Sequence, residues 1–279
     1  MTGPIAQIVS LTCYSNAFLH GDRIPQFFPT NSTCQFCEFI RFVEFRKALL
    51  GNVQEFPAAD NPDEWIASLH DRQAFAARLL RSLENRPGFS DRMLAGFIGG
   101  GGQWTLELLC SNGKSEFWVS HWEVGNREAQ DQRIWRESMA WSAKVRRNPI
   151  PGARSRLSET SLGPVWKQSD ILQTPYGQDN FASCFAKTLN VLDNPDPDVG
   201  YHRDLWVPQQ LAPEAASLLK AATSAWVFGG MGSWNDLSFT GDARSNTKPY
   251  WRGPFSILNE AIEVATSSSH LKGQLSADN

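Results

Sequence analysis

The segment His121-Trp-Glu123 has the spacing at which zinc deaminases place a metal-binding histidine and a proton-transferring glutamate. Those enzymes also need a Pro-Cys-x-x-Cys motif further along the chain, and none follows here. If the segment is a strand, both side chains point to the same face, where a hydrogen bond between strands or contact with solvent explains them equally well. His121 and Glu123 are therefore candidate catalytic residues, but their spacing alone does not indicate an enzyme.

A second pair of candidate residues, His202 and Asp204, stands in the sequence Tyr-His-Arg-Asp-Leu. This segment resembles the catalytic loop of protein kinases, in which the aspartate accepts the proton of the substrate hydroxyl. The kinase loop continues with an asparagine five residues after the aspartate, where this chain has Gln209. Cys184 could act as a nucleophile with His202 only if the fold brings them together, because no local motif links them. We therefore predict no catalytic residue.

Cys34-Gln-Phe-Cys37 has the spacing of a redox dithiol or of half a zinc site. A structural zinc ion needs four ligands, and the chain has no second Cys-x-x-Cys and no His-x₃-His motif. Cys13 and His20 could complete such a site only if the fold brings them close. We interpret Cys34 and Cys37 as small apolar side chains of the core, predict no metal and no other cofactor, and leave metal binding by this pair open.

A glycine cluster in the last quarter of the chain is the best candidate for a binding site. It lacks the Gly-Lys-Ser/Thr of a phosphate loop and the third glycine of a dinucleotide fingerprint. Its glycines can end a helix and form a tight turn, and the polar and aromatic side chains beside them can form a rigid recognition corner. The predicted binding residues are Gly230, Gly232, Trp234, Asn235 and Asp236.

The same cluster carries a resemblance to other proteins. The block Ala225–Asp236, with the sequence AWVFGGMGSWND, resembles the C-terminal portion of an uncharacterised family of bacterial proteins. The resemblance covers about a dozen residues; the stretch from Asp242 to Gly253 is not part of it. It implies a bacterial origin and supplies no catalytic residue.

Charge and composition narrow the choice of partners. The net charge of −3 provides no basic face for phosphates, so we expect no nucleic acid partner. No apolar run approaches the ~20 residues that span a bilayer, so we expect a soluble protein without a membrane partner. Eleven tryptophans and seventeen phenylalanines can fill a core or anchor an interface with another protein.

The N-terminus and the cysteines indicate the compartment. No lysine or arginine precedes Arg23, so the chain lacks the positively charged start of a signal peptide. Five cysteines are an odd number and are spread thinly, which is typical of reduced thiols in the cytoplasm. We therefore expect a cytoplasmic protein.

The sequence pattern of the first half of the chain predicts strands and one helix. Asn61 can cap a helix that starts at Pro62 and continues through Leu83. Ser111-Asn112-Gly113 between apolar runs predicts a hairpin turn, and Gly99 to Gly102 predicts another turn. The predicted strands are residues 5–14, Phe36–Phe45, Met93–Ile98, Trp104–Cys110, Glu116–Val124 and Ile134–Val145.

The second half of the chain predicts helices. Three helices are predicted, and they begin at Asp179 or Asn180, at Pro213 and at Pro254. Gly229 is predicted to end the second of them. The predicted fold class is α+β, an antiparallel sheet with a packed helix followed by a mainly helical half. The predicted divisions are an α+β region over 1–147, a linker over 148–157, a mainly helical region over 158–269 and a polar tail over 270–279.

The leading hypothesis is a non-catalytic bacterial protein of the cytoplasm that binds another protein, with an immunity or inhibitor role toward a toxin as its concrete form. Aromatic side chains, which anchor many protein interfaces, motivate it. The alternative is a hydrolase or metal-dependent enzyme that uses His121, Glu123, His202 and Asp204.

Overall fold

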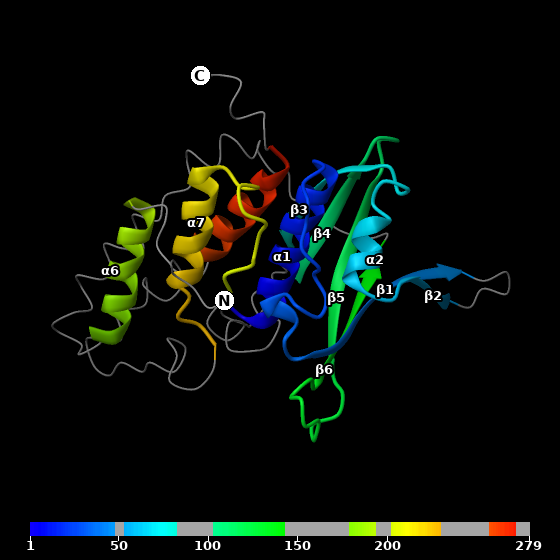
Figure 1. Cartoon of the computed structure of the whole chain (residues 1–279), viewed down its shortest axis with the longest axis horizontal. Coiled ribbons are helices and arrows are strands. Elements are labelled where there is room, and N and C mark those ends of the chain that lie inside the picture. Colours follow the sequence, from blue (N-terminus) through cyan, green and yellow to red (C-terminus); the bar gives the residue numbers. More distant parts are fainter. Residues whose placement is uncertain (48–52, 83–102, 143–178, 194–201, 230–256, 272–279) are drawn as a thin grey trace.

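The computed structural model of the chain describes residues 1–47, 53–82, 103–142, 179–193, 202–229 and 257–271 (Figure 1). Residues 257–267 are also helical. The helices are α1 (Gly3–Leu19), α2 (Pro62–Ala67), α6 (Asp179–Asp193) and α7 (Pro213–Ser224), with 3₁₀ turns η1 (Ser32–Cys34) and η3 (Ser268–Leu271). The strands are β1 (Cys37–Lys47), β2 (Val53–Ala59), β3 (Ala74–Ser82), β4 (Gln103–Cys110), β5 (Ser115–Val124) and β6 (Trp135–Trp141). These elements confirm the α+β class.

The six strands form one sheet in the order β2-β1-β6-β5-β4-β3. The predicted hairpin of β4 and β5 is confirmed, and Gly113 in its turn has φ +76°. The prediction of a purely antiparallel sheet is wrong, because β1 pairs in parallel with β6 while the other pairs are antiparallel. A parallel pair joins strands that are distant in sequence and leaves no turn motif between them.

Residues 5–14, predicted as a strand, lie within helix α1. The helix is buried on every side over Ile5–Ala17. A helix surrounded by protein needs no polar face, so the sequence shows no helical alternation of apolar and polar residues. The buried hydroxyls of Thr12 and Ser15 bond within the helix, to the carbonyl oxygens of Ile8 and Leu11 at 2.7 Å, whereas that of Ser10 donates to the carbonyl oxygen of Asp204.

The helix predicted from Pro62 to Leu83 is also wrong beyond its first turns. Asn61 does cap α2, since its side-chain oxygen accepts a hydrogen bond from the Glu64 amide at 3.0 Å. The helix ends at Ala67, and β3 follows. In β3 both faces are buried, Ala77 and Leu79 on one and Ala76 and Leu80 on the other, and such a strand reads as a continuous apolar run that fits helical spacing too.

The remaining strand predictions have mixed outcomes. Strands at Phe36–Phe45, Trp104–Cys110, Glu116–Val124 and Ile134–Val145 are confirmed as β1, β4, β5 and β6, with shifted ends. Strand β2 was not predicted, because Pro57 within it argues against a strand except at a sheet edge, where β2 lies. Met93–Ile98 and Gly99 to Gly102 lie outside the described residues.

Two of the helices predicted in the second half begin where they were predicted to begin, α6 at Asp179 and α7 at Pro213. Helix α7 ends at Ser224, so Gly229, with φ +142°, does not end it as predicted. Leu258 and Ile262 are buried in the helical residues 257–267, whereas Pro254, the predicted start of this helix, lies outside the described residues. A 3₁₀ turn occupies the start of the predicted tail.

Helix α1 packs against the sheet, with α7 and residues 257–267 on its other side and α6 outermost (Figure 1). The outer edge of β3 is covered by polar side chains from both halves of the chain. Asn16 exchanges two hydrogen bonds with the backbone of Ala77, and the Ser267 hydroxyl exchanges two with Leu79. One apolar core includes residues from α1, the sheet, α7 and 257–267.

The predicted linker over 148–157 lies outside the described residues, so the division of the chain into regions stays a prediction, as does the mainly helical character of the whole second half. Within the described ranges, no helix combines the length and apolar character that crossing a membrane requires.

Candidate functional site

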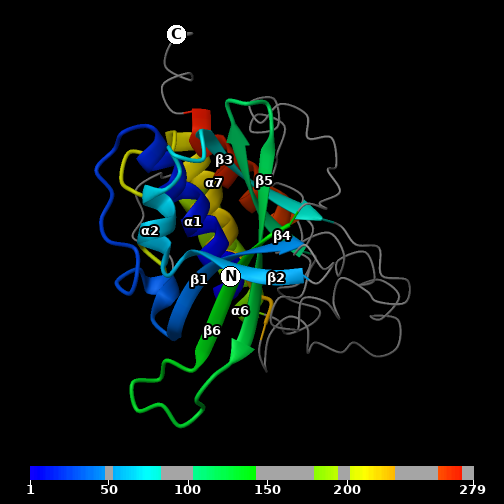
Figure 2. The same ribbon diagram turned by 90° about the vertical axis from the view of Figure 1, so that its right-hand side faces the viewer.

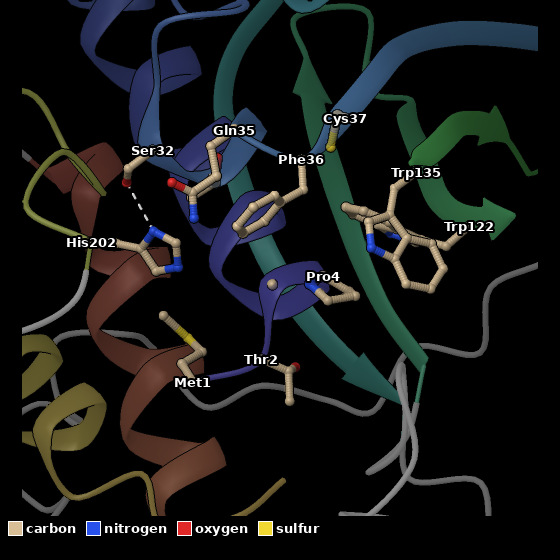
Figure 3. Close-up of a pocket in the computed structure, with 12 residues that line it drawn as sticks. Met1, Thr2, Pro4, Ser32, Gln35, Phe36, Cys37, Trp122, Trp135 and His202 are labelled. Carbon is tan, nitrogen blue, oxygen red and sulfur yellow. Dashed lines mark hydrogen bonds between the residues drawn. The ribbon is translucent and has the colours of Figure 1, made fainter. Parts of the chain in front are cut away.

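A cavity of about 280 Å³ lies at the amino-terminal end of α1 (Figure 3). It is enclosed by the start of α1, by the segment that joins η1 to β1, by the facing ends of β5 and β6, and by His202. The lining residues are Met1–Pro4, Ser32, Thr33, Gln35–Cys37, Trp122, Trp135 and His202. These segments are far apart in sequence, so the cavity is a product of the fold.

Aromatic side chains form one end of the cavity. Trp122 and Trp135 contact each other edge to face, with ring centroids 6.2 Å apart and an interplanar angle of 70°. Phe36, whose backbone carbonyl accepts a hydrogen bond from the Trp135 amide, is 43% exposed, and Val124 beside Trp135 is 41% exposed. This end therefore presents apolar surface both inside the cavity and around it.

The segment around Asp204 is fixed to η1 by hydrogen bonds. The Asp204 carboxylate accepts from the Ser32 amide at 2.7 Å and from the Ser32 hydroxyl. Its backbone carbonyl accepts from the side-chain amide of Asn31 at 2.9 Å, while Asn31 caps η1 by accepting from the Thr33 amide. This double anchor holds residues 202–205 beside α1.

His202 forms the polar end of the cavity with Ser32 and Gln35 (Figure 3). The distance from Ser32 Oγ to His202 Nδ1 is 2.8 Å. Because the Ser32 hydroxyl gives its single proton to Asp204, it can only accept from His202, so Nδ1 carries the imidazole proton. Burial lowers the pKa of His202, so the ring is neutral at pH 7 and its Nε2 is an acceptor.

Cys37 lines the cavity and Cys34 does not, but both side chains are buried in the core, as predicted. The Gln7 side chain donates to Cys37 Sγ at 3.6 Å. Burial raises the pKa of Cys37 to about 12 and raises that of Cys34 as well. Both groups are therefore protonated thiols at pH 7, which are poor nucleophiles and poor metal ligands.

Glu137 is a buried carboxyl group next to the aromatic end of the cavity, paired with Trp122 across the strands. Its Oε1 accepts from the Ser120 hydroxyl at 2.6 Å, and its Oε2 has no hydrogen-bond partner among the described residues. Burial raises the pKa of Glu137 to about 8, against the opposite effect of the Ser120 hydrogen bond. The group is thus mostly uncharged at pH 7.

The fold brings together only two of the four residues of the enzyme alternative. His202 and Asp204 share Ser32 as a partner. His121 and Glu123 are exposed on β5, and strand alternation points them away from the face on which Trp122 lines the cavity. Where the structure describes the chain, no three His, Cys, Asp or Glu side chains converge as a metal site requires.

The predicted binding residues Gly230, Gly232, Trp234, Asn235 and Asp236 lie outside the described residues, so that prediction is untested. Sequence reasoning missed Ser32, Phe36, Trp122, Trp135 and Glu137. A signal existed only for the last three: on strands β5 and β6 the alternation places them on one face, and a charged residue among tryptophans on a core face marks an unusual position.

Comparison with known proteins found no match for this chain, whether among protein-family models, curated proteins or solved structures.

Proposed function

We propose that this chain is a non-catalytic protein that binds another protein through the surface around the aromatic end of the cavity. The observation that carries the proposal is the gathering of Phe36, Trp122 and Trp135 in the lining of one mostly apolar cavity, with Val124 exposed on the strand beside Trp135. Binding energy at protein interfaces concentrates in a few aromatic anchors and the pockets they fill. A cavity walled by aromatic rings at the surface supports this kind of contact.

The neighbouring loop supports the same proposal. Residues 125–134 join β5 to β6 and project beyond the sheet, next to the aromatic end of the cavity (Figure 2). The loop carries charges of both signs, with Arg127, Glu128 and Asp131 exposed. An apolar centre with a charged, solvated rim is the usual composition of a protein interface, in which the rim tunes specificity and association rate.

The concrete form that we propose is a bacterial cytoplasmic immunity or inhibitor protein that binds a toxin. The resemblance of Ala225–Asp236 to bacterial proteins supports the bacterial origin. All five cysteines are unpaired thiols, which supports a reducing compartment. Co-expression with the toxin tests this form, because an immunity protein restores growth and a bystander does not.

The binding proposal is tested by purifying the chain from its host and measuring the affinity of the complex it forms. Trp135→Ala removes an aromatic wall of the cavity, whereas the matched control Phe75→Ala removes a phenylalanine that is 58% exposed on β3, the opposite edge strand of the sheet from β2. We expect a defined complex that the first variant weakens and the control retains. A complex that tolerates Trp135→Ala contradicts the proposed surface.

A hydrolase is the second candidate, favoured by the contact of Ser32 with both His202 and Asp204 at the cavity. The order of contacts argues against it. In a catalytic triad the histidine stands between the serine and the carboxylate, whereas here the serine stands in the middle and gives its proton to the carboxylate. A fluorophosphonate reagent that labels the wild-type protein but not Ser32→Ala would favour this candidate over the first.

A further inference from the structure

The aromatic end of the cavity presents ring faces and no charged side chain. Its rings are those of Phe36, Trp122 and Trp135 (Figure 3), and the lining residues that the structure describes include no lysine, arginine, aspartate or glutamate. The face of an aromatic ring attracts a cation, most strongly when the ring is that of tryptophan. We infer that this end receives the cationic group of an arginine or lysine side chain that the protein partner presents, with Glu137 as its counter-ion. This inference rests on the proposed function and names the type of residue that the partner contributes.

Glu137 belongs to the same layer of side chains as the two tryptophans. It is the cross-strand partner of Trp122 and follows Trp135 by two residues, so the three side chains share one face of the sheet. Directly opposed residues on paired strands have Cβ atoms about 4.5–5.5 Å apart. A cation held by the rings therefore lies near the carboxylate, in surroundings that screen the attraction less than water does. The amino end of α1 also borders the cavity, but a helix end carries only about half a positive charge, which the full charge of the carboxylate outweighs.

Two buried oxygen atoms behind this wall have no hydrogen-bond partner among the described residues. They are Glu137 Oε2 and Gln7 Oε1, and both side chains are completely buried. The Gln7 amide nitrogen donates to Cys37 Sγ at 3.6 Å, and Cys37 belongs to the lining, so Gln7 lies directly behind the cavity wall. A buried oxygen without a donor costs free energy, and a guanidinium or ammonium group brings several donors and no acceptor. A cationic side chain therefore matches what these oxygens lack.

The other titratable groups near Glu137 and in the lining carry no charge at pH 7. The thiols of Cys34 and Cys37 interact electrostatically with Glu137, and burial raises the pKa of both, that of Cys37 to about 12. Burial lowers the pKa of His202 and lowers that of the Met1 amine to about 5. Glu137 holds its own proton up to a pKa of about 8. Because a bound cation favours the carboxylate form, binding releases this proton and becomes tighter as the pH rises toward 8.

The test uses the full chain, labelled with ¹⁵N, and four probes in two matched pairs. The probes are the N-acetyl amides of arginine and its uncharged counterpart citrulline, and of lysine and its uncharged counterpart norleucine. The indole N–H signals of Trp122 and Trp135, assigned with Trp122→Phe and Trp135→Phe, report binding at the cavity. At pH 8 we expect both signals to shift, with the charged member of each pair binding about five- to thirtyfold more tightly. Equal affinities within each pair, or shifts that leave these two signals unchanged, overturn the inference.

The pH dependence of binding tests the role of Glu137. For the wild type, the affinity for the arginine amide should rise between pH 6 and pH 8, by about tenfold per pH unit at most, and level off above pH 8. Glu137→Gln exchanges one uncharged buried group for another, so it should fold and bind the amide more weakly, with an affinity that does not change with pH. The matched control Glu123→Gln, on the opposite, exposed face of β5, should keep the wild-type behaviour. A wild-type affinity that is independent of pH, or a Glu137→Gln protein that retains the rise, overturns the inference.

Failure of the inference is distinguishable from failure of the proposed function. Equal binding of the charged and uncharged probes leaves the partner complex and its dependence on Trp135 intact. A complex that tolerates Trp135→Ala contradicts the proposed function itself.

Discussion

Two aromatic clusters lie on the same face of the sheet and share strand β5. Trp118 belongs to the first cluster, in which its ring centroid lies 5.6 Å from those of Phe42 and Trp65, and all three side chains are completely buried. Trp122, four residues later, belongs to the second, in which it contacts Trp135 at the partly exposed cavity. The residue types are the same, so composition does not separate the two.

The difference between the clusters lies in what covers them. Trp65 belongs to α2 and stacks on Phe42 at 4.5 Å, which seals the first cluster from solvent, and the Arg72 guanidinium lies 5.0 Å from the centre of the Trp118 ring. The second cluster borders a cavity and a charged loop. We therefore expect the first cluster to carry stability and the second to carry recognition, and the following variants test that contrast.

The largest effect is expected for Trp118→Ala in the covered cluster. The substitution removes a completely buried ring from contact with Phe42 and Trp65 and leaves a cavity, which costs about 3–5 kcal/mol of unfolding free energy. Urea denaturation of the wild type and the variant measures it. A loss below about 1 kcal/mol would show that the covered cluster is not a packed core.

Glu137→Gln is expected to stabilise the protein in a pH-dependent way. The folded protein holds the Glu137 proton up to a pKa of about 8, whereas the unfolded chain releases it near the usual value of 4.5. Wild-type stability therefore falls between these two pH values, by about 3 kcal/mol at pH 7 from this group alone.

The glutamine carries no charge, so its unfolding free energy lacks this contribution to the decline. Urea denaturation at pH 4, 7 and 9 should give similar values for the two proteins at pH 4 and a growing advantage for Glu137→Gln above it. A constant difference at all three pH values would mean that Glu137 does not retain its proton beside the cavity.

Asp204→Ala tests the anchor of the polar end. The substitution removes the carboxylate that accepts from the Ser32 amide and hydroxyl, and hydrogen bonds to a charged group contribute about 1.5–3 kcal/mol. We expect a loss of that size in thermal or urea unfolding, together with a changed chemical shift of the His202 ring. Unchanged stability and an unchanged His202 signal would separate Asp204 from the cavity.

The smallest loss of stability is expected for Trp135→Ala. Its side chain is only partly buried, so the variant should lose less than half of what Trp118→Ala loses, at most about 2 kcal/mol. Denaturation of both variants in the same buffer makes the comparison. Equal losses would remove the distinction between the two clusters.

Local signals in the sequence predicted part of the fold. Asn61 before Pro62 marked the start of α2, and Asn112-Gly113 marked the β4–β5 turn, because in both cases neighbouring residues decide the conformation. The strand predicted at residues 5–14 failed for the opposite reason. Tertiary burial on all sides of α1 removed the polar face by which a helix is recognised.

The candidate site was not predictable in the same way. Ser32 and His202 are 170 residues apart, and their contact depends on how η1 and the segment around Asp204 pack against α1. Trp122 and Trp135 meet because the consecutive strands β5 and β6 are neighbours, as the predicted antiparallel sheet implied, but their exposure depends on what lies over that end of the sheet. The sequence therefore predicted which strands pair, but it did not predict which side chains other parts of the chain shield from solvent.

The most direct test of the account is the dissociation constant of the complex between the partner protein and Trp135→Ala, measured by calorimetry beside the wild type and Phe75→Ala. An aromatic anchor point at an interface contributes about 2 kcal/mol or more, so we predict at least a ~30-fold weaker complex for Trp135→Ala and an unchanged one for Phe75→Ala. A Trp135→Ala protein that is folded and binds with wild-type affinity would contradict the assignment of recognition to this cavity.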